Sequence, residues 1–158
     1  PPQGLFPPDR DRYNGAMSDH QVELEVSTPG RGLFPIDRDV TSIVKSSGVQ
    51  TGLCVVFCRH TSASLLIMEN ADPEVRTDLT AFFHRLVPPT TDPSMSYLTH
   101  TYEGPDDMPA HIKAALMPVS LSIPVENGQL LLGTWQGIYV AEHRNRPHTR
   151  EIAAHFGG

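Results

Sequence analysis

The sequence contains no long hydrophobic run, since no apolar stretch approaches the roughly 20 residues that a membrane-spanning helix needs. Its N-terminal residues also lack the apolar core of a secretory signal peptide. We therefore expect a cytoplasmic protein without a membrane segment.

Cysteine is scarce, because the chain has only Cys54 and Cys58, which share one apolar segment. If that segment is a strand, the two side chains lie on one face about 13 Å apart, since a strand rises ~3.3 Å per residue. That separation is too long for a disulfide between them. We expect two buried thiols in a reducing compartment.

Positive charge is also in short supply, since 12 Lys and Arg residues stand against 18 Asp and Glu residues, for a net charge of −6. Broad electrostatic attraction to nucleic acid is therefore not expected. A small anionic substrate would need a local cluster of cations. Together with Lys113, residues near the C-terminus could form such a phosphate clamp, namely Arg144, Arg146, His148 and Arg150. The alternative is a solvated rim.

Several well-known site motifs are missing from the sequence. It has no His-Glu-x-x-His, no paired Cys-x-x-Cys, no Ser/His/Asp signature, no glycine-rich phosphate loop and no dinucleotide fingerprint. It does contain eight histidines. His60, His100 and His111 are far apart in sequence, but each lies at a predicted element boundary, where functional sites concentrate. Their spacing neither favours nor excludes a three-histidine metal site.

A chain of 158 residues predicts one domain. Residues 1–17, rich in Pro, Arg, Asp and Gly, are expected to form an irregular N-terminal arm, and residues 18–158 the domain. Hydrophobic patterns predict strands over 20–28, 52–59, 65–68, 120–125, 130–132, 134–143 and 151–156. They predict helices from Asp37 or Asp39 to Gly48, over 74–86, and from Asp106 or Asp107 to a point before Pro118. This pattern predicts a compact α+β fold, a mostly antiparallel sheet or sandwich with two to three helices.

Local signals refine this prediction. Asn127-Gly128 between two apolar runs predicts a β-hairpin with a type I′ turn. Asp72-Pro73 predicts a helix start, with the carboxylate as cap and the proline in the first turn. Asn70 offers a second acceptor beside this start. Trp135 is expected in the core, and Gln136, next to it, would point to the opposite face, where it could reach a site.

The segment over residues 102–114 combines a turn, two acids, a helix start and a histidine. Gly104-Pro105 predicts the turn, and Asp106 or Asp107 could cap the helix that follows. His111 would then lie near the helix N-terminus, where the positive end of the dipole disfavours imidazolium. A neutral imidazole has a lone pair for a metal ion or a proton. The alternative is a surface or packing histidine.

Five segments occur in a distinctive order, and together they closely resemble the YjbQ-like family, which is described as a secondary thiamine-phosphate synthase family. The segments are His60-Thr61-Ser62-Ala63-Ser64, Glu69-Asn70-Ala71-Asp72, Asp106-Asp107-Met108-Pro109-Ala110-His111-Ile112-Lys113, Ser122-Ile123-Pro124 and Leu132-Gly133-Thr134-Trp135-Gln136. The likeness extends from about His20 to Phe156 and leaves residues 1–17 uncovered.

The resemblance implies a compact α+β fold that assembles as a homotrimer, with a histidine-lined site near the subunit interfaces. It also implies a divalent metal ion, with zinc as the first choice and magnesium as the second. Carried over residue by residue, the implied site comprises His60, Asn70, Asp72, His111 and Gln136, with His100 aligned more loosely. Where many relatives have Glu-Phe-Asp-Gly-Pro-Arg, this chain has Glu142-His143-Arg144-Asn145-Arg146-Pro147. His143 is therefore a poor candidate for a family ligand.

The implied activity joins a pyrimidine methyl diphosphate to a thiazole phosphate and releases pyrophosphate. In this hypothesis His60, His100 and His111 hold the metal ion, which with arginines neutralises charge on the leaving group. The catalytic candidates are His111, Asn70, Asp72, Asp106 and Gln136. The substrate-binding candidates are Arg144, Arg150 and Lys113.

Two alternatives stay open. One is a metal or phosphometabolite binding protein without a primary catalytic role. The other is a metal-assisted hydrolase, in which His111 or Asp106 activates a metal-bound water. In each case the expected partners are small phosphorylated metabolites and further copies of the chain, not nucleic acid or a membrane.

Overall fold

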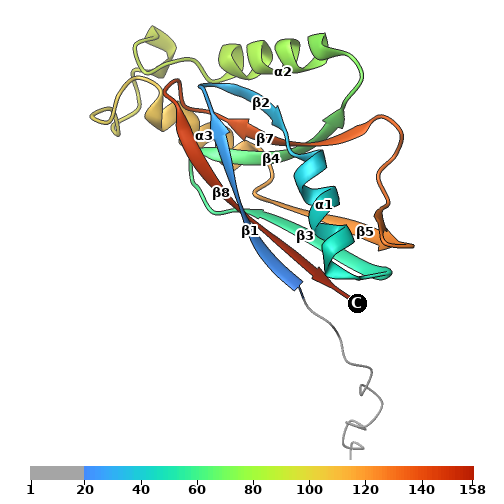
Figure 1. The fold of residues 1–158 in the computed structure, drawn as a ribbon. Coiled ribbons are helices and arrows are strands. Elements are labelled where there is room, and N and C mark those ends of the chain that lie inside the picture. The colour runs from blue at the N-terminus through green and yellow to red at the C-terminus, as the bar shows by residue number, and fades with distance from the viewer. Residues whose placement is uncertain (1–19) are drawn as a thin grey trace, which may run out of the picture.

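Alternating apolar residues form strands that pair into two antiparallel sheets (Figure 1). The computed structural model describes residues 20–158, so the arm predicted for residues 1–17 lies outside the described part. The strands are β1 (His20–Thr28), β2 (Gly32–Pro35), β3 (Thr51–Cys58), β4 (Ala63–Glu69), β5 (Ser120–Glu126), β6 (Gln129–Leu130), β7 (Gln136–Glu142) and β8 (His148–Gly157). The larger sheet has the order β1-β8-β3-β5-β6, and the smaller has the order β2-β7-β4.

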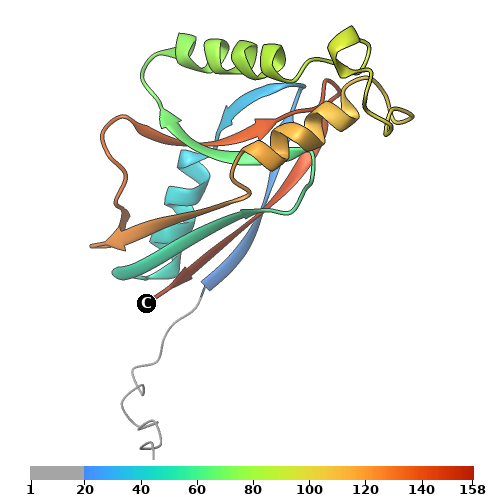
Figure 2. The same ribbon diagram turned by 180° about the vertical axis from the view of Figure 1, so that it is seen from behind.

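The described chain also has three helices and one short 3-10 turn. They are α1 (Asp37–Ser47), α2 (Pro73–Leu86), α3 (Asp107–Leu116) and the short 3-10 turn η2 (Pro93–Met95). α1 packs against the sheets from inside the core, and α2 and α3 pack against them from the surface. α2 lies over the smaller sheet, while α3 packs beside β4 (Figures 1 and 2). Within residues 20–158, no helix has both the length and the apolar character needed to cross a membrane. The fold is α+β, as the sequence predicts.

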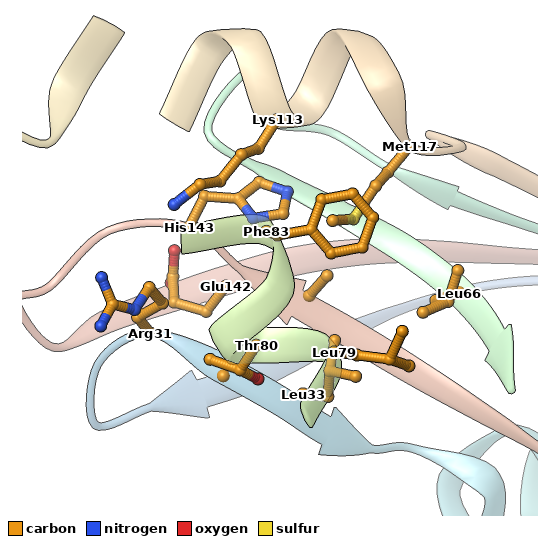
Figure 3. A pocket seen from close by; sticks show the side chains of 12 residues that line it. Arg31, Leu33, Leu66, Leu79, Thr80, Phe83, Lys113, Met117, Glu142 and His143 are labelled. Carbon is orange, nitrogen blue, oxygen red and sulfur yellow. The ribbon is translucent and has the colours of Figure 1, made fainter. Parts of the chain in front are cut away.

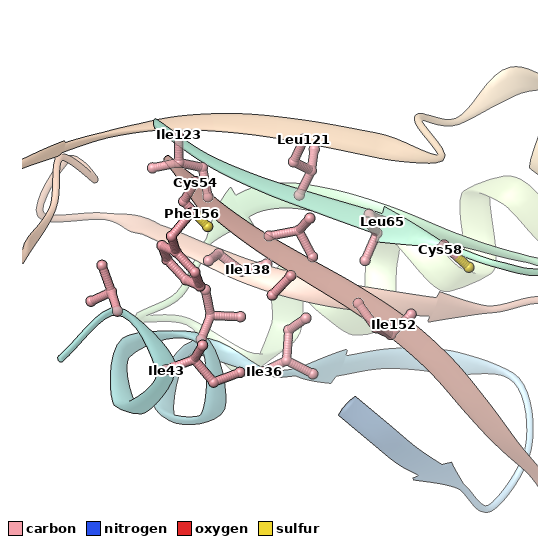
Figure 4. Close-up of a cluster of buried hydrophobic side chains, with 14 of the residues drawn as sticks. Ile36, Ile43, Cys54, Cys58, Leu65, Leu121, Ile123, Ile138, Ile152 and Phe156 are labelled. Carbon is pink, nitrogen blue, oxygen red and sulfur yellow. The ribbon is translucent and has the colours of Figure 1, made fainter. Parts of the chain in front are cut away.

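The core contains residues of both sheets and of α1 (Figure 4). Period-two alternation turns Cys54, Val56 and Cys58 of β3 inward, and both cysteines are free and buried, as predicted. Ile138 of β7 and Phe156 of β8 belong to the same buried cluster. Burying one such side chain stabilises the fold by about 1.5–3 kcal/mol relative to exposure, so this cluster holds the sheets against each other.

The local sequence signals agree with the observed element ends. Gly48 ends α1 in the left-handed conformation, at φ 74°. Asn127 and Gly128 have φ of 52° and 71°, as the type I′ turn between β5 and β6 requires. Asp72 caps α2, since its Oδ1 accepts a hydrogen bond from the N–H of Glu74 at 2.9 Å.

The prediction that Trp135 belongs to the core is wrong. Trp135 is 64% exposed, because it lies in the loop that precedes β7 and not on the strand itself. The apolar residues of α2 are also less covered than in most amphipathic helices. No residue of α2 is buried, and Phe82 and Leu86 are more than half exposed. α2 is therefore a surface layer and not part of the core.

A buried ion pair joins the two sheets at the end of β7. Glu142 Oε1 accepts hydrogen bonds from Arg150 Nε of β8 at 2.7 Å and from Thr28 Oγ1 of β1 at 2.6 Å. Arg150 also donates to Ser62 Oγ at 3.0 Å. Burial alone would raise the pKa of Glu142, but the bonds from Arg150 and Thr28 outweigh it and lower the pKa. The ionised pair is therefore a fixed crosslink between the sheets.

We expect Glu142→Ala to lower the free energy of unfolding by about 3–5 kcal/mol, because it leaves the buried Arg150 without a counter-charge. Urea denaturation at neutral pH measures this loss. The matched control is Glu126→Ala at the exposed end of β5, for which we expect a change within about 0.5 kcal/mol. Equal losses in the two variants would contradict the crosslink.

Candidate functional site

One arginine holds the start of α3 against the loop that follows β7. Arg144 donates from Nε to Asp106 Oδ2 at 3.1 Å and from Nη1 to Asp107 Oδ1. The backbone N–H of Asn145 also donates to Asp106 Oδ2, at 2.8 Å. The side chain of Asp106 is thus bonded to this loop and makes no capping hydrogen bond, so the cap predicted at Asp106 is not formed.

Three side chains converge where α3 begins, and we call them the His100–Asp107–His111 cluster. Their potential ligand atoms all lie within 4.8 Å of one another. Asp107 Oδ2 is 2.9 Å from His100 Nε2 and 3.3 Å from His111 Nε2. Asp107 and His111 are four residues apart on α3, a spacing that puts both on one helix face. Asp107 is buried, whereas each histidine keeps one side open to solvent.

The other ring nitrogen of His111 identifies its tautomer. Nδ1 lies 2.9 Å from the carbonyl oxygen of Thr61, which can only accept, so Nδ1 carries the proton. In the neutral ring, Nε2 then has a lone pair and faces Asp107 Oδ2, which is a second acceptor. Two acceptors repel each other, so the contact between Nε2 and Oδ2 is favourable only when a proton or a metal ion lies between them. A backbone carbonyl bonded to the distal nitrogen is also how metal-binding histidines are oriented.

His100 adds further acceptor atoms to the cluster. Its Nε2 lies 2.8 Å from Glu103 Oε2 and 2.9 Å from Asp107 Oδ2. A ring nitrogen carries one proton at most, so it cannot bond both carboxylates fully. The cluster therefore holds more lone pairs than protons, an arrangement that a divalent cation would stabilise.

Asp107 has the protonation state that a metal ligand needs. Burial alone would raise the pKa of Asp107, but the hydrogen bond with His100 and the charge of Arg144 outweigh burial, and the pKa is lowered. Asp107 is therefore ionised near neutral pH. Since Arg144 binds Oδ1, the other oxygen of Asp107 is left to face the two histidines.

This donor set fits zinc. Two imidazoles and one carboxylate are a common set for a zinc ion that keeps an open fourth position. Tetrahedral zinc with bonds of about 2.0–2.1 Å separates its ligand atoms by roughly 3.3 Å. Asp107 and His111 match this separation at 3.3 Å, Asp107 and His100 are closer at 2.9 Å, and all three atoms lie within 4.8 Å, so the histidines would shift slightly to bind the ion. Magnesium prefers a shell of oxygen ligands, which this cluster does not supply.

His60, the third predicted metal ligand, lies outside the cluster. Its Nε2 accepts a hydrogen bond from the N–H of Glu151 at 2.7 Å. Burial, followed by the charge of Arg150, lowers the pKa of His60. Together with His111, His60 lines a hollow of about 320 Å³ beside α3. The structure thus brings His100 and His111 together and places His60 on the wall of the adjoining hollow.

Asn70, Asp72 and Gln136 lie at the opposite end of β4 from the cluster. Asn70 Nδ2 donates to the carbonyl of Gln136 at 3.3 Å, and Asp72 caps α2. Thr61, which bonds His111, precedes β4, whereas Asn70 follows it. The seven residues of β4 span about 20 Å. Within one chain, these three candidates are therefore not part of the same site as His111.

The three candidate phosphate ligands do not converge either. Arg144 is bonded to Asp106 and Asp107, and Arg150 is bonded to Glu142. Lys113 is two positions after His111 on α3, which rotates it by about 200° around the helix axis. It therefore faces away from the cluster.

Lys113 reaches into a small pocket between α3, α2 and the turn before β2, which we call the Lys113 pocket (Figure 3). Its polar lining is Arg31, Thr80, Lys113, Glu142 and His143, and its apolar lining includes Leu33, Leu66, Leu79, Phe83 and Met117. Burial, followed by the charge of Arg31, lowers the pKa of Lys113 to about 8. Burial, followed by the charge of Lys113, lowers the pKa of His143 to about 4.

Sequence reasoning did not select Asp107 or Glu103 as ligands. For Asp107 a signal was available, because its spacing of four from His111 on a predicted helix puts the two on one face. Glu103 lies in the loop before α3, where no periodicity identifies the direction of a side chain. Arg31 is far from Lys113 in sequence, and only the fold brings it to the pocket.

We expect acidification from pH 7 to pH 5 to lower the free energy of unfolding of the wild type by about 2 kcal/mol more than that of His143→Gln. The pKa of His143 is about 4 in the fold, against an ordinary value of 6.5, so the unfolded chain binds a proton that the folded chain excludes. This loss grows as the pH falls from 6.5 toward 4. Urea denaturation at several pH values measures it, and parallel profiles for the two proteins would contradict a buried neutral His143.

Comparisons with known proteins agree on one family. The family described as UPF0047 protein YjbQ-like matches residues 22–158. The UPF0047 protein sll1880 of Synechocystis sp. is 52% identical over 139 residues, which cover 88% of this chain and 92% of that protein. The UPF0047 protein YjbQ of Salmonella typhimurium is 43% identical over 142 residues, which cover 88% of this chain and 98% of that protein.

Solved structures share the fold. An uncharacterized conserved protein of the YjbQ/UPF0047 family from Clostridium acetobutylicum matches with a TM-score of 0.75 at 38% identity, covering 85% of this chain and 98% of that one. A YbjQ-like protein of unknown function from Sulfolobus solfataricus matches with a TM-score of 0.78 at 25% identity, covering 90% and 99%. This chain belongs to the UPF0047 family of YjbQ-like proteins.

Proposed function

We propose that this protein is a metal-dependent transferase of the thiamine-phosphate synthase type. It would join a pyrimidine methyl diphosphate to a thiazole phosphate and release pyrophosphate. The observation that carries the proposal is the convergence of His100, Asp107 and His111, with the proton of His111 held on Nδ1 by Thr61. The resemblance to the synthase family supplies the reaction, and the cluster would hold a metal ion suited to it.

The cluster favours zinc over magnesium, because two of its three ligand atoms are imidazole nitrogens. When bound, the ion would act as a Lewis acid that neutralises negative charge on the departing pyrophosphate. His100, Asp107 and His111 would hold it. Arg144 would keep Asp107 ionised and correctly turned, and the Thr61 carbonyl would keep His111 in the required tautomer.

The hollow beside α3 offers space for a small heterocyclic substrate. Its volume of about 320 Å³ is within the range of small-molecule sites, roughly 300–1,000 Å³. His60 and His111 supply its polar groups, while Ala63, Ala114 and Val119 supply apolar surface. In the neutral form that burial favours, His60 can exchange a proton with a bound ring.

A metal or phosphometabolite binding role without synthesis is the second candidate function. It is favoured by the pairing of both predicted phosphate-binding arginines, since Arg144 and Arg150 are bonded to carboxylates. A leaving pyrophosphate would have to compete with those carboxylates. Metal-assisted hydrolysis has weaker support, because Asp106, its candidate base, is bonded to Arg144 and Asn145.

The proposal includes a homotrimer located in the cytoplasm. The resemblance to the family supplies the homotrimer, and the large exposed apolar side chains are candidates for its contact surface; they include Phe82, Leu86, Tyr97, Tyr102 and Trp135. The two free, buried thiols of Cys54 and Cys58 support a reducing compartment.

We expect each chain to bind one zinc ion, and His111→Ala to weaken zinc binding by about 100-fold or more, since even partners behind the ligands contribute about 10–100-fold. Competition with a chromogenic chelator measures the affinity. His148→Ala is the matched control, because His148 is a half-buried histidine outside the cluster. Equal affinities for both variants would remove His111 from the metal site. An unchanged affinity in His60→Ala would separate the cluster from the three-histidine site of the sequence analysis.

We expect the zinc-loaded protein to release pyrophosphate only when both thiamine precursors are supplied, and His111→Ala to abolish the release while the fold stays intact. A coupled pyrophosphate assay and circular dichroism measure the two quantities. Release without the thiazole phosphate would point to hydrolysis instead. Tight zinc retention without any release would favour the binding role.

A further inference from the structure

We propose that the groove between α2 and β2 binds an elongated dicarboxylate, an anion with one carboxylate at each end and a short apolar middle. We call this surface the α2–β2 groove. It shares no residue with the His100–Asp107–His111 cluster or with the hollow beside α3. The proposal therefore goes beyond the synthase function and does not depend on it.

The α2–β2 groove has room for such a ligand. It is open to solvent and has a volume of about 520 Å³, within the range of small-molecule sites, roughly 300–1,000 Å³. One wall is the face of α2 that carries Arg76, Thr80 and His84, since positions four apart share a helix face. The other wall is the turn before β2 and the start of β2, an edge strand of the smaller sheet. A ligand that lies along the groove would contact both α2 and this sheet.

The charged side chains of the groove are cationic. Arg31 and Arg76 line it, and none of its lining residues is acidic, although the chain has a net charge of −6. The two acids of α2, Glu74 and Asp78, are each two positions from Arg76, which rotates them by about 200° around the helix axis. The groove is therefore a positive surface that would attract a small anion to a chain that otherwise repels one.

Neither guanidinium of the groove is neutralised by a carboxylate of the described chain. Arg59, Arg144 and Arg150 form ion pairs with carboxylates. Within residues 20–158, Arg31 and Arg76 form none. Both can therefore pair with a ligand, and a guanidinium binds a carboxylate through two parallel hydrogen bonds.

Contacts with the protein hold both guanidinium groups in place. Arg31 lies in the turn between β1 and β2, and its Nη1 donates to His84 Nδ1 at 2.6 Å. Arg76 lies over the ring of Tyr139, with Cζ 6.0 Å from the ring centroid. A side chain that is already positioned loses less conformational entropy when a ligand binds.

His84 adds a neutral donor beside Arg31. Because arginine can only donate, Nδ1 of His84 is the acceptor, and the proton of the neutral ring is on Nε2. Burial, followed by the charge of Arg31, lowers the pKa of His84, so the ring is uncharged near neutral pH. Each end of the groove thus presents one guanidinium, and a single negative charge at each end of the ligand matches it.

The spacing of the two ends determines the shape of the ligand. Arg76 and His84 are eight positions apart, which is about 12 Å along α2. Between them the groove is lined by Leu33, Thr80 and Ala81. Thr80 Oγ1 donates to the carbonyl oxygen of Arg76 at 2.7 Å, so its proton is not available to a ligand. A methylene chain would lie against these side chains while its carboxylates reach the two guanidiniums.

The test uses suberate, a straight-chain dicarboxylate, and octanoate, which has the same chain length and one carboxylate. Calorimetric titration should show that the wild type binds suberate at least about 5-fold more tightly than octanoate, because a second guanidinium–carboxylate pair forms. Arg31→Gln and Arg76→Gln should each bind suberate no more tightly than octanoate. Arg85→Gln is the matched control, because Arg85 is an exposed arginine of α2 outside the groove. It should bind suberate as the wild type does.

Several outcomes would overturn the proposal. One is a wild type that does not bind suberate or that binds octanoate more tightly. Another is equal weakening in Arg85→Gln and in the two groove variants, since net charge alone would then account for the effect. His111→Ala should bind suberate as the wild type does, and a loss of binding in this variant would place the ligand at the cluster instead. Failure of the pyrophosphate assay with suberate binding retained would contradict only the synthase proposal.

Discussion

The buried carboxylate of Glu142 is the contact on which the arrangement of this molecule depends. It belongs to the smaller sheet, yet its partners Arg150 and Thr28 belong to the larger one. Its Oε2 also accepts from the N–H of Arg144 at 3.2 Å, and the side chain of Arg144 binds Asp107 at the start of α3. One carboxylate therefore sets the spacing of the sheets and, through Arg144, the position of the cluster. A buried ion pair of this kind fixes the relative position of the elements that it joins more than it adds to the free energy of unfolding.

The two faces of α3 have different surroundings. Its Asp107–His111 face belongs to the His100–Asp107–His111 cluster, and Lys113 on the other face lines the Lys113 pocket. About half a turn of helix is enough to separate the two, because positions two apart point in nearly opposite directions. The two groups of side chains can thus have separate surroundings within one short helix.

More of the fold than of the candidate site could be predicted from the sequence. The Asn127-Gly128 turn and the Asp72 cap are local effects, and both are present in the structure. The site depends on long-range contacts, which no local pattern contains. Arg144 shows this, since its cationic side chain suggested a phosphate ligand, but folding places it against Asp107. Trp135 was expected in the core because of its size, whereas the loop before β7 leaves it exposed.

The lack of buried residues in α2 affects how often solvent reaches the side chains beneath the helix. The helix has fourteen residues, none of them buried, and an isolated helix of that length is only marginally stable in water. It should therefore detach from the smaller sheet by local opening far more often than the whole protein unfolds. Since Leu79, Thr80 and Phe83 of α2 form one wall of the Lys113 pocket, each such opening would expose the side chains on the opposite wall, Lys113 and His143 among them, to solvent.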